Sequence, residues 1–116
     1  MSKPVGPYSP VVRAGEWLVT SGQIGISSGA LVAGGLPAEV GQALANLRAV
    51  LEGAGSSIGD VVKTTVFLTD MSDFATMNEL YAEFFGDHRP ARSTVAVAGL
   101  PLGARFEIEA WAWSAG

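Results

Sequence analysis

The chain has 116 residues and a formal net charge of −4, and 48% of its residues are hydrophobic against 16% charged. This length suits one domain with a single core, spanning residues 1–116, and the acidic balance argues against nucleic acid or an anionic membrane surface as a partner. Cysteine is absent and His88 is the only histidine, which excludes disulfides, thiolate nucleophiles and a histidine cluster, so we expect no metal.

The first half of the chain predicts a β-hairpin followed by an amphipathic helix. Val11 to Arg13 and Trp17 to Ile24 are rich in β-branched and aromatic residues and are separated by a short turn segment, which is typical of a hairpin. Glycines then interrupt the pattern, with room for one further short strand. Pro37 suits the first position of a helix that ends at Gly53 and Gly55. The apolar residues at helical spacing are Val40, Leu44, Leu47, Val50 and Leu51.

The second half predicts a strand, a second helix and two further strands. Asp60 to Thr69 is rich in β-branched residues and mostly apolar, as expected of a covered strand. Ser72 or Asp73 is suited to cap a helix that stops at Gly86. One side of this helix is formed by Phe74, Met77, Leu80, Tyr81 and Phe84. The two final strands span Ser93 to Ala98 and Ala104 to Trp113.

The element order β-β-(β)-α-β-α-β-β predicts an α+β fold. Two right-handed crossovers lay both helices on one face of a single mixed sheet and leave the other face uncovered. No stretch approaches the about 18 apolar residues of a membrane span, and the first residues lack the apolar core of a signal peptide. We therefore expect a soluble, cytoplasmic protein with no membrane partner.

The last two strands indicate what the uncovered sheet face carries. In the last strand, one face holds Phe106, Ile108, Ala110 and Ala112, and the other holds Arg105, Glu107, Glu109, Trp111 and Trp113. In the preceding strand, Val95 and Val97 match the apolar face, which leaves Arg92, Thr94, Ala96 and Ala98 beside the glutamates. Tryptophans and small alanines are unusual on a solvated face, so we predict a homo-oligomer packed through its sheets. Arg92 and Glu107 then lie at or near a subunit boundary, where a charge needs a partner.

Six segments together resemble one known family in order and spacing. They are PVGPYSP at the start, SGQI, KTTVFLTDM, DFATMNELYAEFF, PARSTV and FEIEAWA. The chain is similar over essentially its whole length to the RidA/YjgF family. This resemblance implies a single domain of the chorismate-mutase-like α+β type, assembled as a homotrimer with the sheets facing inward and a cleft between each pair of subunits.

The resemblance also implies an activity, the hydrolysis of reactive enamine and imine intermediates. The substrates are of the 2-aminoacrylate and 2-iminopropanoate type, and the products are 2-keto acids and ammonia. The partner is then a small imino or enamino acid. Because an iminium carbon is already electrophilic, the reaction needs an oriented substrate and one water but no cofactor.

The matching motifs assign roles to particular residues of this chain. Arg92 in PARS binds the substrate carboxylate through its planar guanidinium, and Glu107, the first glutamate of FEIE, positions or activates the attacking water. The cleft lining supplies shape and hydrogen bonds. Its residues are Tyr8, Ser21, Gly22, Asn78 and Thr94.

Simpler roles for these residues, and other functions for the protein, stay open. Arg92 could serve assembly alone, in an ion pair with Glu107 or Glu109, and Glu107 could do no more than orient Arg92. Asn78 could bond to the backbone. The rival functions are an endoribonuclease or translation inhibitor, and a module that binds a small carboxylate or acts as a chaperone without catalysis.

Overall fold

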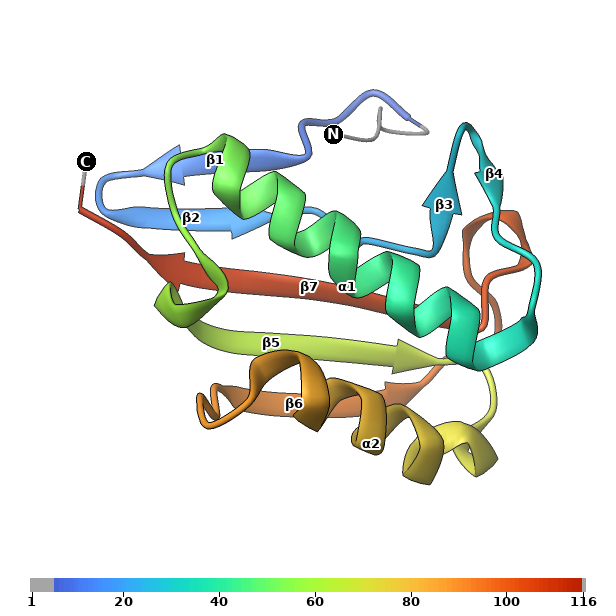
Figure 1. Ribbon diagram of the computed structural model, residues 1–116. Coiled ribbons are helices and arrows are strands. Elements are labelled where there is room, and N and C mark those ends of the chain that lie inside the picture. The colour runs from blue at the N-terminus through green and yellow to red at the C-terminus, as the bar shows by residue number, and fades with distance from the viewer. Residues whose placement is uncertain (1–5, 116) are drawn as a thin grey trace.

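The computed structural model describes residues 6–115 and shows a five-stranded mixed sheet with both helices on one face (Figure 1). The strand order is β1-β2-β7-β5-β6, and only β5 and β6 run parallel to each other. The strands are β1 (Val11–Ala14), β2 (Trp17–Thr20), β5 (Val61–Leu68), β6 (Ala91–Ala96) and β7 (Phe106–Trp113). The predicted α+β class, with two helices on one face of a mixed sheet, is confirmed.

The glycine-rich stretch after the first hairpin forms a separate two-stranded sheet. Its strands are β3 (Ile26–Ser27) and β4 (Ala30–Leu31). The predicted strand to Ile24 is too long, because β2 ends at Thr20 and Gln23 then makes an isolated bridge to Ile108 of β7. This bridge brings the SGQI segment alongside the start of the last strand.

The first helix, α1 (Gly35–Gly53), begins two residues before the predicted start at Pro37. All five residues of its predicted apolar stripe are buried, with Val40, Leu47 and Leu51 fully inaccessible. Burial of such a stripe against the sheet contributes about 1.5–3 kcal/mol for each large side chain. Within residues 6–115 we find no helix with the length and hydrophobicity needed to cross a membrane.

The second helix, α2 (Phe74–Phe85), follows a single 3-10 turn whose N-terminus is capped by Asp70, which accepts a hydrogen bond from the Ser72 backbone N–H at 2.9 Å. Asp73 stands at the N-cap position of α2 as predicted, but its side chain makes no capping hydrogen bond and instead pairs with Arg105 at 2.8 Å. The buried residues of the helix are Met77, Tyr81 and Phe85, whereas the predicted Phe74 is 38% exposed. Gly86 ends the helix with a φ of 63°, as expected.

The uncovered sheet face carries an aromatic and acidic surface, as the alternation in β7 predicts. The helix side of β7 is completely buried, at Phe106, Ile108, Ala110 and Ala112. On the uncovered face Trp111 and Trp113 are 44% and 48% exposed, and Glu107 and Glu109 are half-buried. Trp17 packs edge-on against both tryptophans, with ring centroids 5.9 and 5.0 Å apart.

The predicted facing of β6 is wrong. In the parallel ladder Arg92 pairs with Thr64 and Thr94 pairs with Val66, and both partners are buried beneath the helices. Arg92, Thr94 and Ala96 therefore lie on the helix side, while Val95 is 42% exposed on the uncovered face. Because β6 is an edge strand that α2 covers only in part, its helix-side positions accept polar residues and its valine is not drawn inward.

Candidate functional site

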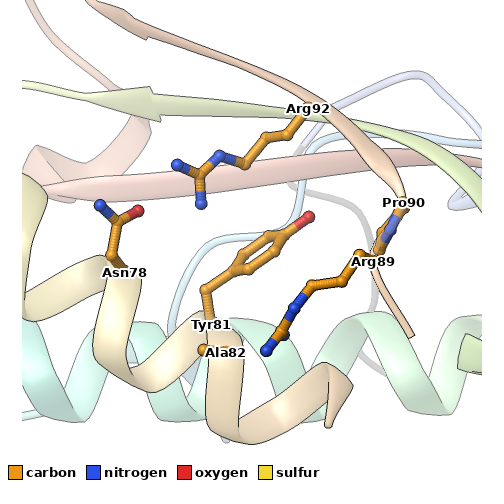
Figure 2. A pocket seen from close by; sticks show the side chains of 6 residues that line it. All are labelled: Asn78, Tyr81, Ala82, Arg89, Pro90 and Arg92. Carbon is orange, nitrogen blue, oxygen red and sulfur yellow. The ribbon is translucent and has the colours of Figure 1, made fainter. Parts of the chain in front are cut away.

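A cavity of about 410 Å³ lies between α2 and β6, on the helix side of the sheet edge (Figure 2). Its lining consists of Asn78, Tyr81, Ala82, Arg89, Pro90 and Arg92. Two of the predicted site residues, Arg92 and Asn78, therefore share one cavity. Within residues 6–115 no cluster of three His, Asp or Glu side chains is arranged to hold a metal ion.

Arg92 is held against aromatic rings rather than against an acid. Its guanidinium carbon lies 4.8 Å from the centroid of the Tyr81 ring and 5.7 Å from that of Phe74. Such cation–π contacts contribute about 0.5–2 kcal/mol and leave the edge of the guanidinium free to bind. Within the described chain no carboxylate pairs with Arg92, so its charge is available to an anion.

A hydrogen bond to Thr64 holds the Tyr81 side chain in place. The Tyr81 hydroxyl and Thr64 Oγ1 are 2.7 Å apart, and Thr64 is fully buried directly beside Arg92 in the strand ladder. Burial raises the pKa of Tyr81, and the opposing effects of Thr64, Arg92 and Arg89 are smaller. The neutral phenol therefore serves as a rigid platform that sets the direction of Arg92.

Asn78 presents an unsatisfied acceptor to the cavity. Its Oδ1 is buried and has no hydrogen-bond partner within residues 6–115, and Figure 2 shows the amide directed toward the Arg92 guanidinium. The simpler role of a bond from this oxygen to the backbone is therefore wrong. Leaving a buried acceptor unpaired costs about 1–3 kcal/mol, which a ligand N–H or O–H would offset.

Glu107 lies in a second cluster, against the SGQI segment. Gln23 and Ile108 exchange both backbone hydrogen bonds, at 2.7 and 3.0 Å, which holds Gly22 beside the Glu107 side chain. A Cβ on Gly22 would lie 2.6 Å from Glu107 Cδ and Oε2, so any larger residue at position 22 would displace the Glu107 carboxylate. The Ser21 hydroxyl donates to the Ser9 carbonyl oxygen at 2.6 Å and so holds the segment that follows Tyr8.

The electrostatics of Glu107 suit a proton acceptor. Burial raises the pKa of Glu107, and the like charge of Glu109 raises it further. A carboxylate with a raised pKa is a stronger base than a solvated one and is matched more closely to neutral pH. No positively charged side chain contributes to this shift, so Glu107 does not act as an ion-pair partner of Arg92 within one chain.

The two clusters lie on opposite faces of the sheet. Glu107 is opposite Phe67 in β5, Phe67 is opposite Val95 in β6, and Arg92 is three residues before Val95. A strand spacing of about 4.8 Å and a rise of about 3.3 Å per residue separate the Arg92 and Glu107 Cα atoms by roughly 14 Å. One small molecule therefore cannot contact both side chains of the same chain.

The structure thus divides the seven predicted site residues into two groups. The group on the helix side is Arg92, Asn78 and Thr94, and the group near the uncovered face is Glu107, Gly22 and Ser21, with Tyr8 adjacent to Ser9, whose carbonyl oxygen accepts the Ser21 hydrogen bond. Tyr81 and Arg89 are not among the predicted site residues. Helical spacing places Tyr81 in the core stripe, but its hydroxyl signals that a buried tyrosine needs a polar partner.

The sequence also matches known proteins over nearly its whole length. The family described as Endoribonuclease L-PSP matches residues 1–114. The chain belongs to this family, the RidA/YjgF family. Among RidA/YjgF relatives, the 2-iminobutanoate/2-iminopropanoate deaminase of Mus musculus is 50% identical over 108 residues, which are 91% of this chain and 80% of the murine protein.

Solved structures of RidA/YjgF proteins have the same fold. The yjgF gene product of Escherichia coli matches with a TM-score of 0.89 at 45% identity, covering 95% of this chain and 90% of that one. The E. coli TdcF structure with bound serine matches with a TM-score of 0.90 at 42% identity, covering 97% of this chain and 91% of that one. The family match at residues 1–114 spans both clusters of candidate site residues.

Proposed function

We propose that this RidA/YjgF protein hydrolyses enamine and imine intermediates of the 2-aminoacrylate and 2-iminopropanoate type to 2-keto acids and ammonia. The observation that carries the proposal is Arg92, which is oriented by Tyr81 into a cavity and has no carboxylate partner within residues 6–115. The 50% identity to a 2-iminobutanoate/2-iminopropanoate deaminase supplies the reaction class.

Arg92 binds the substrate carboxylate in this proposal. A guanidinium forms two parallel hydrogen bonds to a carboxylate, which fixes the orientation of the acid as well as its position. Asn78 Oδ1 accepts a hydrogen bond from the imine N–H or from the attacking water, which satisfies its unpaired acceptor. A relative with bound serine, a small amino acid that carries a carboxylate, supports a ligand of this chemistry.

Glu107 acts on the water. Its carboxylate accepts a proton as the water oxygen bonds to the imine carbon and passes this proton to the nitrogen, which gives a carbinolamine. The same carboxylate then moves the hydroxyl proton of the carbinolamine to the nitrogen, and the carbon–nitrogen bond breaks to give a keto group and ammonia. One water is consumed for each imine, and the reaction as proposed uses no metal and no cofactor. The raised pKa of Glu107 supports this base role over a purely orienting one.

Two copies of the chain form each site in this proposal. Because Arg92 and Glu107 lie on opposite faces of one sheet, a site that uses both requires Arg92 from one copy and Glu107 from another. The exposed tryptophans of the uncovered face support packing between copies. We propose the homotrimer and the chorismate-mutase-like arrangement that the family resemblance implies, and a location in the cytoplasm.

Release of ammonia tests the proposal. An amino-acid oxidase generates the imine in situ, and wild type is compared with Arg92→Ala and with Arg48→Ala, which removes an exposed arginine of α1 outside the cavity. We expect acceleration by wild type and by Arg48→Ala, and loss in Arg92→Ala. No acceleration by wild type with small or bulky imines would contradict the proposal and leave a binding module without catalysis.

The family description favours ribonuclease activity as a second candidate. This candidate predicts RNA cleavage that persists through repeated purification and is lost in Arg92→Ala or Glu107→Gln. Cleavage that falls with each purification step would contradict it. The net charge of −4 provides little attraction for a phosphate backbone, so we place this activity second.

A further inference from the structure

We propose that Arg89 forms a second anion subsite in the Arg92 cavity, which makes imino acids with a second carboxylate preferred substrates. Imino dicarboxylates such as 2-iminoglutarate are the chemical class. This inference rests on the proposed function and names the substrates that the same site favours.

Arg89 and Arg92 line one cavity from the same short segment. They flank Pro90 and Ala91, and Pro90 also contributes to the lining. Proline fixes its own φ near −65° and restricts the residue before it, so the backbone that carries Arg89 is constrained. In Figure 2 the side chain of Tyr81 lies between the two guanidinium groups. Both cations lower the pKa of Tyr81 against the effect of its burial, which agrees with both being near its ring.

The cavity has two positive charges and no negative one. None of its six lining residues is acidic, and within residues 6–115 neither arginine forms an ion pair. Asp87 and Glu83 are close to Arg89 in the sequence, yet neither pairs with it. Two guanidinium groups that share one cavity repel each other unless anionic groups lie beside them. A ligand with two carboxylates satisfies both arginines at once.

The size of the cavity also exceeds the needs of the smallest imino acid. Its volume of about 410 Å³ lies within the range of about 300–1,000 Å³ that is usual for small-molecule sites. 2-Iminopropanoate has about six non-hydrogen atoms and 2-iminoglutarate about ten, and both are small for a site of this size. The volume therefore leaves room for the longer acid, whose first carboxylate binds Arg92 and whose second binds Arg89 in this proposal.

The test compares the selectivity of wild type with that of Arg89→Gln. Selectivity is the kcat/KM for 2-iminoglutarate divided by the kcat/KM for 2-iminopropanoate, both generated by amino-acid oxidases. We expect Arg89→Gln to lower this ratio about tenfold, which is about 1.4 kcal/mol of transition-state stabilisation. The matched control, Arg48→Gln, makes the same charge change on α1 outside the cavity and keeps the wild-type ratio. An Arg89→Gln ratio within twofold of wild type overturns the inference.

Equilibrium binding separates this inference from the proposed function. Calorimetry measures the Kd of 2-oxoglutarate and of pyruvate, the corresponding keto acids, in wild type and in Arg89→Gln. If wild type hydrolyses neither imine, the deaminase proposal is refuted. Binding of 2-oxoglutarate that is tighter than binding of pyruvate in wild type, but not in Arg89→Gln, would still support the second subsite. Equal affinity of wild type for the two keto acids would overturn it.

Discussion

Replacement of Gly22 by alanine displaces the Glu107 carboxylate with little change to the fold. The φ of Gly22 is not positive, so the backbone accepts alanine. The added Cβ would lie 2.6 Å from Glu107 Cδ and Oε2. These atoms are at the end of a flexible side chain, which rotates away more readily than backbone moves.

The expected loss of activity follows from the size of this displacement. Ordinary van der Waals contact begins at 3.4 Å, so the carboxylate must retreat by about 0.8 Å. A misplacement of about 1 Å in a catalytic group costs on the order of 100-fold in rate. We therefore expect Gly22→Ala to lower kcat/KM for 2-iminopropanoate hydrolysis about 100-fold, approaching the effect of Glu107→Gln.

Ammonia release and thermal unfolding measure the two effects, with Gly25→Ala as the matched control. A Cβ on Gly25 meets the Glu39 backbone, 2.7 Å from Cα and 2.8 Å from the carbonyl oxygen, so this clash lowers the Tm instead. Gly22→Ala keeps a Tm near wild type. Activity of Gly22→Ala within threefold of wild type would refute a catalytic role for the present Glu107 position.

Three further predictions test separate parts of the account. Burial raises the pKa of the Glu107 carboxyl, so the folded protein holds this proton more tightly and its stability falls as pH rises from the unfolded pKa through the folded one. Because Glu107→Gln cannot lose this proton, the Tm of the variant relative to wild type, measured by calorimetry, rises with pH over this range. A Tm difference in favour of the variant that shrinks with rising pH would contradict this. Tyr81→Phe leaves the buried Thr64 hydroxyl unpaired and lowers the free energy of unfolding by about 1–3 kcal/mol. Tyr81→Phe keeps the ring beneath Arg92 and Tyr81→Leu removes it, so steady-state kinetics show a larger rise in KM for Tyr81→Leu than for Tyr81→Phe. Equal KM values for the two variants would contradict a role of the ring in orienting Arg92. Trp111→Arg puts a charge on the uncovered face and lowers the mass measured by light scattering, whereas an unchanged mass would refute packing through the sheets.

The helices were predictable because their sequence periodicity is strong. The stripe from Val40 to Leu51 and the glycine at position 86 determine where α1 packs and where α2 ends. The alternation of β7 was equally informative, because this central strand has one fully buried face.

The facing of β6 could not be read from its sequence. Val95 and Val97 indicate a buried face only in a strand that is well covered, and β6 lies at the sheet edge. Its facing is set by the pairing of Arg92 with the buried Thr64, a contact between segments far apart in the chain. The error mattered, because it placed Arg92 and Glu107 on one surface when they lie on two.

The aromatic support of Arg92 was hidden for a similar reason. Tyr81 belongs to the apolar stripe of α2, and helical spacing alone does not show that its ring also contacts a cation on the neighbouring strand. The motif resemblance identified Arg92 and Glu107 by residue type, and the three-dimensional arrangement shows that one chain does not bring them together.

Complementation between two inactive variants tests the shared site most directly. Arg92→Ala and Glu107→Gln are co-expressed with different tags, and assemblies that contain both are purified and assayed for ammonia release. If each site takes Arg92 from one copy and Glu107 from its neighbour, a trimer that contains both variants restores an intact pair at about one site in three. The account predicts about a third of wild-type activity in these doubly tagged assemblies. Activity no higher than that of either parent would contradict a site built from two copies.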